Sequence, residues 1–237
     1  PSSADDPCVR NFLTRFARSA WRRTLEPEEV DQLADLASRL GSDLGDAWKG
    51  LRYATASVLL SPHFLWRVEV GEPDEDTGLT RFTSVEMASR LSFLIWDGLP
   101  DDELLDLADD GVLVDVGTVR EQAERMIDDP RARPALTKFF RELMLLVNID
   151  GALSKDPEQF PQLTETLGRS MRLELEKGFE NVVFDEEGDF RKLLTTRDTF
   201  VNGELAELYG IDGIGSSNDD DFVKVTMPAS SHRAGLL

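Results

Sequence analysis

Two acidic runs offer the densest sets of oxygen ligands in this sequence. Asp185, Glu187 and Asp189 lie within one short run, and Asn218–Asp221 forms a second. Carboxylate and amide oxygens are the ligands that Ca²⁺ prefers in proteins. Neither run has the twelve-residue spacing of an EF-hand loop, so a solvated acidic turn is the alternative for both. The first run provides the calcium candidates Asp185, Glu187 and Asp189.

Imidazole and thiol chemistry has few residues to draw on. The chain has two histidines, His63 and His232, and one cysteine, Cys8. A histidine could act as a base or a metal ligand near neutral pH, but packing or capping is the simpler interpretation of both. The set is too small and too dispersed for a usual zinc site. Cys8 cannot form a disulfide within the chain, and the simplest expectation is a buried free thiol.

Paired carboxylates could do acid–base work, but the sequence indicates no such pair. Glu174 and Glu176 are two positions apart on an expected helix and therefore do not share a face. No Glu-x-x-His pair, nucleophile elbow, phosphate-binding glycine loop or dinucleotide fingerprint occurs. The cluster Asp101–Glu103 fits the positive end of the helix that follows it. The catalytic residues, if any exist, stay unknown from the sequence.

Large aromatic and basic side chains have structural interpretations. A carbohydrate-binding platform is conceivable for the tryptophans, but their helical spacing favours core packing for all four, which are Trp21, Trp48, Trp66 and Trp96. In so acidic a chain, Arg22, Arg23 and Arg90 are expected to be buried partners of carboxylates.

The charge balance excludes some classes of partner. The net charge is −20, from 46 acidic and 26 basic residues. A nucleic acid needs a basic surface, so we expect no nucleic-acid partner, and an anionic membrane surface is disfavoured for the same reason. No run approaches the roughly 20 apolar residues that a membrane span needs. An acidic surface favours solubility, and basic proteins or divalent cations remain as ligands.

Helical periodicity dominates the chain and sets the fold class. Thr83 and Glu86 predict a capping box ahead of an apolar stripe that Gly98 and Pro100 end. Gly41 is expected to end the second helix, and Gly71–Gly78 to form a loop. The alternating run Phe222–Met227 predicts a strand, which lacks a partner if the chain stops at Leu237. We predict an all-α, multi-helix bundle with a short β element near the C-terminus.

Several segments resemble, in the same order, the motifs of an exported bacterial family catalogued as domain of unknown function 1592. This family is abundant in planctomycetes and myxobacteria, and its N-terminal companion is domain 1595. The central segment Thr83–Leu105, with A-S-R-L-S-F-L-I-W and L-P-D-D-E-L-L, is similar to the family's hallmark. The other similar segments are F-A-R-S-A-W-R-R-T-L-E-P-E-E-V (16–30), S-P-H-F-L-W-R (61–67), T-F-V-N-G-E-L-A-E-L-Y-G-I (199–211) and H-R-A-G-L-L (232–237). The last segment resembles the start of a further module, domain 1588.

The resemblance implies a cellular setting but no activity. Family members are typically exported, often as lipoproteins, and many are linked to c-type cytochrome modules. This chain has no Cys-x-x-Cys-His site, so a c-type haem would sit on a linked module and no cofactor is expected in this chain itself, calcium apart. The family also suggests an interchain disulfide at Cys8. Export would place the protein in the periplasm, at the outer membrane or outside the cell.

The sequence divides into three expected parts and leaves two functions open. The parts are an N-terminal three-helix unit (1–73), a main helical domain (74–212), and a loop and strand (213–237) that start a truncated module. The first function is a non-catalytic structural and interaction module that docks its own missing modules or a c-type cytochrome. The alternative is an extracytoplasmic hydrolase-like enzyme that uses paired carboxylates and a site completed by the missing C-terminal module.

Overall fold

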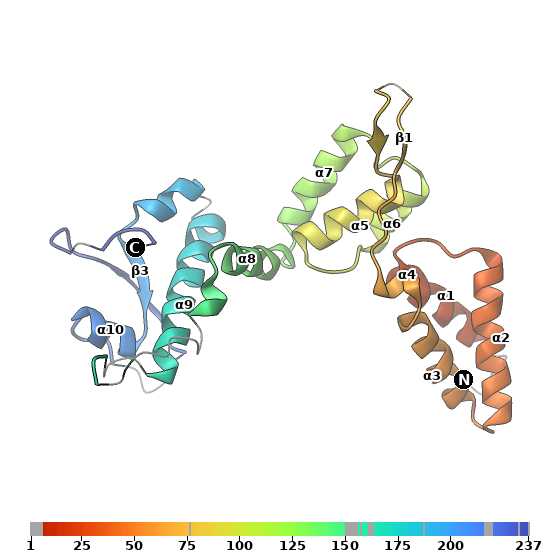
Figure 1. Ribbon diagram of the computed structural model, residues 1–237, viewed down its shortest axis with the longest axis horizontal. Helices are drawn as coiled ribbons and strands as arrows, with labels where there is room; N and C mark the ends of the chain where they lie inside the picture. The colour runs from red at the N-terminus through yellow and green to blue at the C-terminus, as the bar shows by residue number, and fades with distance from the viewer. Residues whose placement is uncertain are drawn as a thin grey trace. The chain divides into compact units, whose positions relative to one another are not determined.

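The computed structural model describes residues 7–75, 77–149, 156, 158–160, 164–186, 188–215, 220–231 and 233–236. Within these residues the chain forms ten α-helices and two small two-stranded sheets, which confirms the expected all-α class (Figure 1). It divides into two compact units, residues 1–132 and 133–237. The three-part division expected from the sequence stays a prediction.

The first unit begins with three helices around one apolar core. They are α1 (Pro7–Trp21), α2 (Pro27–Asp43) and α3 (Ala47–Leu59), followed by the short α4 (Pro62–Leu65). Each helix turns a stripe of residues at helical spacing inward, as an amphipathic sequence should. The buried residues include Leu13, Ala17, Leu33, Ala37, Ala54 and Val58.

Gly41 does not end the second helix, contrary to the expectation. It is buried inside α2, which continues to Asp43, and it faces Gly50 of α3. A Cβ built on Gly50 would lie 2.2 Å from the Ala37 carbonyl oxygen and 2.6 Å from the Gly41 nitrogen. The two glycines therefore let the backbones of α2 and α3 come into direct contact.

The rest of the first unit is built on three more helices. They are α5 (Ser84–Ile95), α6 (Asp102–Asp109) and α7 (Val116–Ile127). The capping box of α5 is present: Thr83 Oγ1 accepts from Glu86 N, and Glu86 accepts from Thr83 N at 2.8 Å. Part of the predicted loop instead forms a hairpin, in which β1 (Glu72–Pro73) pairs antiparallel with β2 (Thr80–Arg81).

The second unit packs helices on both sides of a long central helix, α9 (Glu165–Glu180). It contains α8 (Ala132–Leu143, of which Ala132 belongs to the first unit), the 3₁₀ turn η1 (Leu146–Asn148) and α10 (Gly203–Tyr209). A π-helical turn, η2 (Asn181–Asp185), extends α9, and a second 3₁₀ turn is η3 (Phe190–Leu194). Phe140, Phe179 and Leu193 belong to one apolar cluster, and Leu167, Val201 and Leu205 belong to another.

The C-terminal strand has a partner, so the expectation of an unpaired strand is wrong. β4 (Val223–Thr226) pairs antiparallel with β3 (Asp198–Val201), in the register Asp198↔Thr226 to Val201↔Val223. The partner was missed because only four residues of β3 are extended, immediately before the α10 helix. No helix among the described residues is long and apolar enough to cross a bilayer.

Candidate functional site

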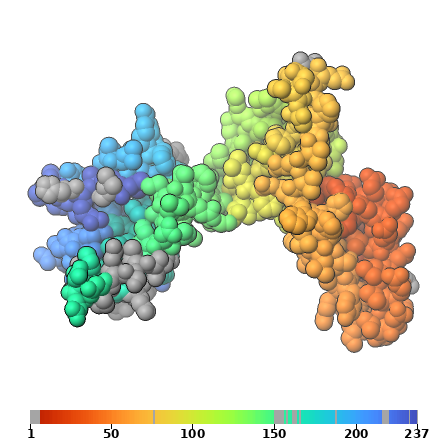
Figure 2. Space-filling model, in the orientation of Figure 1, coloured from red at the N-terminus to blue at the C-terminus, as the bar shows by residue number. Residues whose placement is uncertain are grey.

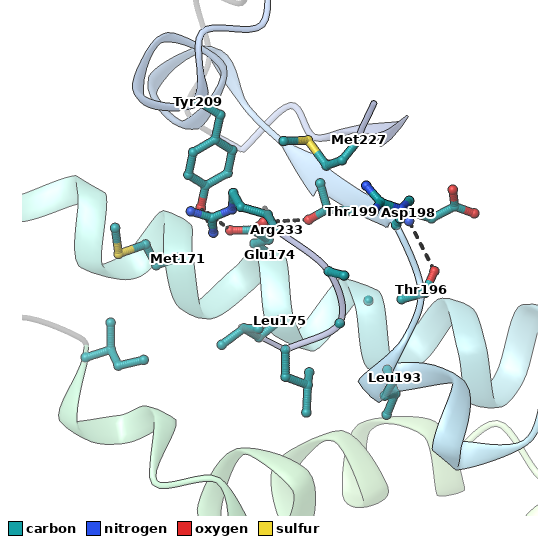
Figure 3. Close-up of a pocket in the computed structure, with 16 residues that line it drawn as sticks. Met171, Glu174, Leu175, Leu193, Thr196, Asp198, Thr199, Tyr209, Met227 and Arg233 are labelled. Atoms are coloured by element: carbon teal, nitrogen blue, oxygen red, sulfur yellow. Dashed lines mark hydrogen bonds between the residues drawn. The ribbon is translucent and has the colours of Figure 1, made fainter. Parts of the chain in front are cut away.

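The second unit contains a cavity of about 200 Å³ between α9, β3 and the final segment of the chain (Figure 3). Apolar side chains form most of its wall, and polar groups gather where α10 meets α9. The apolar part includes Met171, Leu175, Leu193, Met227 and Leu236, and the polar part includes Glu174, Thr199, Tyr209 and Arg233.

Glu174 is the buried centre of the polar part. Only 8% of this residue is exposed, and its carboxylate accepts hydrogen bonds from the Thr199 hydroxyl and, at 2.6 Å, from the Tyr209 hydroxyl. The Arg233 guanidinium lies 3.9 Å from the centre of the Tyr209 ring, and its Nη2 donates to the phenolic oxygen at 3.0 Å. Glu174 thereby joins β3 and α10 to α9, and Tyr209 in turn holds the final segment through Arg233.

Tyr209 is held in its protonated form. Burial raises its pKa, and the negative charge of Glu174 and its hydrogen bond raise it further. At neutral pH the phenol therefore remains a hydrogen-bond donor to the carboxylate. This fixed donor–acceptor pair suits stabilisation of the fold, or binding of a small polar group, better than proton transfer.

Glu176 is also buried but belongs to a different cluster. It is 5% exposed, and it accepts from Arg141 Nε at 2.6 Å and from Arg172 Nη1 at 2.8 Å. Two residues along a helix correspond to a rotation of about 200°. The expectation that Glu174 and Glu176 do not share a face is confirmed, and the two do not form a catalytic pair.

Removing the Tyr209 hydroxyl should destabilise the second unit. In Tyr209→Phe the buried carboxylate keeps only the Thr199 donor, and we expect a loss of about 1–3 kcal/mol in the free energy of unfolding. Urea unfolding followed by circular dichroism measures this loss. The matched control is Tyr53→Phe on α3, where the residue is 53% exposed and the same change should have almost no effect. Equal effects at both positions would contradict the role given to Tyr209.

The calcium candidates do not converge within the described residues. Asp185 pairs with Arg133, while Asp189 caps η3 and pairs with Arg191. Glu187 lies outside the described residues. In the second acidic run, Asp220 contacts Arg169 at 2.6 Å, whereas Asn218 and Asp219 lie outside the described residues. Over the described ranges no three His, Cys, Asp or Glu residues are placed to hold one metal ion, and calcium stays a prediction.

In the first unit, Arg18 of α1 joins the N-terminal helices to α6. Its guanidinium donates to Asp106 at 2.7 Å and to Asp109 at 2.8 Å, and it lies 3.7 Å from Asp102. Asp109 also accepts from the Thr24 hydroxyl at 2.6 Å. These contacts hold the pKa of Asp109 below its usual value against the opposing effect of burial. Arg18 is thus a structural residue of this junction.

Arg22 is buried without the carboxylate partner that the sequence analysis expected. Only 6% of it is exposed, and its guanidinium donates to three carbonyl oxygens, those of Ala20 at 3.1 Å, His63 at 2.7 Å and Trp66 at 3.0 Å. Its charge lies 5.9 Å from the centre of the Phe93 ring of α5. Its backbone is left-handed (φ 60°), a conformation that glycine usually adopts at the residue after a helix. Burial lowers its pKa from the ordinary arginine value.

The other two arginines do pair with carboxylates, as expected. Arg23 donates to both oxygens of Glu29, at 2.7 and 2.8 Å, and Arg90 contacts Glu69 at 2.7 Å. Arg90 is exposed and Arg23 is half-buried, so the expectation that they are buried is wrong for both. The His63 ring packs on Trp21 at 5.1 Å, in keeping with the packing role expected for this residue, and His232 lies outside the described residues.

Glu29 should make the first unit sensitive to acid. Its hydrogen bonds with Arg23 lower its pKa from 4.5 to about 2. As the pH falls, the Glu29 carboxylate of the unfolded chain therefore takes up a proton before that of the folded chain. The stabilisation that the contact with Arg23 provides is complete above about pH 4.5 and is lost as the pH falls towards 2. We expect the stability gap between wild type and Glu29→Gln to narrow over this range in urea unfolding. Glu28→Gln, one residue away, controls for the lost charge. A stability difference between wild type and Glu29→Gln that does not change with pH would contradict the lowered pKa of Glu29.

Cys8 and two tryptophans are more exposed than expected. Cys8 is exposed rather than buried, and the interchain disulfide stays a prediction. Trp96 is buried and donates from Nε1 to the Met126 carbonyl at 2.9 Å, as a core residue should. Trp48 and Trp66, however, are 62% and 68% exposed. Core packing is therefore wrong for these two, because Trp66 follows the end of α4 and Trp48 lies in the first turn of α3.

Sequence reasoning missed the polar cluster around Glu174. Its members are far apart in the chain, and a glutamate on an amphipathic helix carries no signal for the tyrosine that it contacts. The one available signal was that Tyr209 and Arg233 both lie in segments that resemble family motifs.

The comparisons with known proteins cover the segment that contains Tyr209 but not the one that contains Arg233. A family model described as PSD4, a protein of unknown function (DUF1592), matches residues 82–211, more than half of the chain. A second model, PSD5, a protein of unknown function (DUF1595), matches residues 8–69. The chain therefore belongs to the DUF1592 family and carries the DUF1595 module ahead of it. Neither a curated protein nor a solved structure matched this chain.

Proposed function

We propose that this chain is a non-catalytic structural and interaction module of a larger exported protein. It docks either the remaining modules of its own precursor or a c-type cytochrome. The observation that carries this proposal is that arginines of the family-like segments make structural contacts within the first unit. Arg18, from the DUF1595 match, binds the carboxylates of Asp106 and Asp109 in the DUF1592 match, and the Arg22 guanidinium lies 5.9 Å from the centre of the Phe93 ring. These two arginines thus hold the two matched regions of the first unit together.

The acidic surface supports a basic partner. The chain carries a net charge of −20, and α6 and its end present a row of exposed carboxylates that Arg18 neutralises only in part, namely Asp102, Glu103, Asp106, Asp109 and Asp110. Charge complementarity of this kind speeds encounter and selects partners of opposite sign. A cytochrome whose haem edge is ringed by lysines has the matching charge.

Binding to such a cytochrome tests the proposal. In calorimetric titrations we expect the chain to bind a lysine-ringed c-type cytochrome at about 20 mM salt and to lose most of this affinity near 300 mM, where charges are screened. An acidic c-type cytochrome of similar size is the control ligand. Asp102→Asn with Asp110→Asn should weaken binding more than Glu28→Gln with Asp35→Asn on α2, which removes the same charge. Absent or salt-independent binding would contradict docking to a cytochrome and leave the remaining modules of the precursor as the docking partner.

A hydrolase-like enzyme is the second candidate, and the cavity around Glu174 is the observation that favours it. The cavity is smaller than the roughly 300–1,000 Å³ typical of ligand sites, so a further module would have to complete it. The test is hydrolysis of a polysaccharide panel by the full-length protein. An activity that Glu174→Gln removes while the protein stays folded would support the enzyme. No activity on any substrate of the panel would leave the interaction module as the preferred function.

A further inference from the structure

The segment between α4 and β1 lies in extended conformation along α5. Arg67 lies over the Phe93 ring at 5.3 Å, Glu69 pairs with Arg90, and Val70 N donates to Glu86 Oε1 at 2.7 Å. From Arg67 to Val70 the segment advances three residues, while its contacts on α5 move seven residues, from Phe93 to Glu86. Seven residues of a helix are about 10 Å long, and so are three residues of a strand. The segment is therefore extended. Figure 2 shows this orange segment on the viewed face of the first unit.

The side chains of this segment alternate in their contacts. Arg67 and Glu69 contact α5 and each other, with Arg67 Nε 3.3 Å from Glu69 Oε1, although the Arg67 side chain stays 47% exposed. The residues between and beside them face solvent. These are Trp66, Val68 and Val70, which are 68%, 66% and 76% exposed. A strand with an apolar face of this kind is open to pairing with another strand.

The backbone of the segment has one free edge. The amides of Val70 and Gly71 both donate to Glu86 Oε1, because the chain turns at Gly71 (φ 73°). Ahead of this turn the segment is extended, and in an extended segment the amides of alternate residues point the same way. The amides and carbonyls of Arg67 and Glu69 therefore point to the opposite side. Within the described part of the chain, they make no hydrogen bond with another backbone group.

We infer that this edge pairs with the same edge of a second copy of the chain. The sequence Trp66-Arg67-Val68-Glu69-Val70 is complementary to itself when two copies run antiparallel about a two-fold axis at Val68. In this register Arg67 of each copy lies opposite Glu69 of the other, and Trp66 lies opposite Val70. Opposite charges and aromatic–β-branched pairs are both favourable across strands.

The free edge selects the same register independently. In an antiparallel pair, directly opposed residues alternate between hydrogen-bonded and non-bonded pairs. An axis at Val68 makes Arg67 and Glu69 the hydrogen-bonded pair, and these are the two residues whose amides point away from Glu86. The side-chain charges and the backbone thus favour one and the same alignment with a second copy.

Sedimentation equilibrium across roughly 1–500 µM protein tests this pairing. The average mass should rise with concentration from that of one chain towards that of two. Val68→Lys opposes two lysines at the axis and should keep the chain monomeric, whereas Val116→Lys, at a valine that is 72% exposed on α7, should associate as the wild type does. A wild type that stays monomeric throughout, or association unchanged by Val68→Lys, would overturn the inference.

A charge exchange gives a stricter version of the test. In Arg67→Glu, positions 67 and 69 both carry glutamate, so like charges face each other across the two copies. In Glu69→Arg both positions carry arginine, with the same result. Each variant alone should therefore lose association. An equimolar mixture restores every opposite-charge pair and should form a mixed dimer. Circular dichroism verifies that both variants are folded. If the mixture remains monomeric while the wild type associates, the proposed register is wrong.

Discussion

Gly50→Ala should strongly lower the free energy of unfolding of the first unit. The added Cβ would lie 2.2 Å from the Ala37 carbonyl oxygen and 2.8 Å from Gly41 Cα, and both are backbone atoms of α2. No side-chain rotation relieves this contact, so α2 and α3 must separate. Overpacking of a core costs about 1–3 kcal/mol, and we expect about 3 kcal/mol or more here because the clash is with backbone.

Gly178→Ala is the matched control for this prediction. Gly178 lies within α9, and nothing is found within 4 Å of a Cβ built on it. The same substitution should therefore stabilise the second unit by about 0.5–1 kcal/mol, because alanine favours a helix over glycine. Urea unfolding of both variants tests the contrast, and a Gly50→Ala protein as stable as the wild type would show that α2 and α3 are not in backbone contact.

The second large effect is expected at Arg22. In Arg22→Met the side chain keeps its apolar stem but no longer donates to the carbonyls of Ala20, His63 and Trp66. A buried acceptor left without a donor costs roughly 1–3 kcal/mol. The Ala20 contact is buried and the His63 and Trp66 contacts are partly buried, so we expect a total loss of about 3 kcal/mol in the stability of the first unit.

Two variants separate this effect from the loss of charge alone. Arg15→Met lies on the exposed side of α1, the helix that ends just before Arg22, and should change stability by less than about 0.5 kcal/mol. Arg22→Lys keeps the charge but has no planar fork to reach three carbonyls, so it should fall between the wild type and Arg22→Met. A stable Arg22→Met protein would remove the main support for the structural junction described above.

The sequence was a good guide to local structure. The capping box formed by Thr83 and Glu86 and the helical stripes predicted the helices and the fold class, because both depend on neighbouring residues. The contact between Gly41 and Gly50 and the pairing of β3 with β4 depend on segments that meet only in the folded chain. A strand of four residues before a helix carries too little alternation to indicate its partner.

The polar clusters were harder to predict for a related reason. Arg22 was expected to bind a carboxylate, but it binds backbone carbonyls, which every residue has and no sequence pattern marks. Glu174 and Tyr209 are 35 residues apart, and nothing in either sequence position indicates their contact. Trp66 was placed in the core by helical spacing, yet α4 ends one residue earlier and the spacing no longer applies.

The most direct test of the docking function uses the protein isolated from its native source at low salt. Sedimentation velocity is followed both at the haem Soret band and by total protein absorbance. The proposed function predicts that this chain and a haem-bearing polypeptide sediment in one boundary, which separates when the salt is raised. A chain that sediments colourless and without another polypeptide would contradict it.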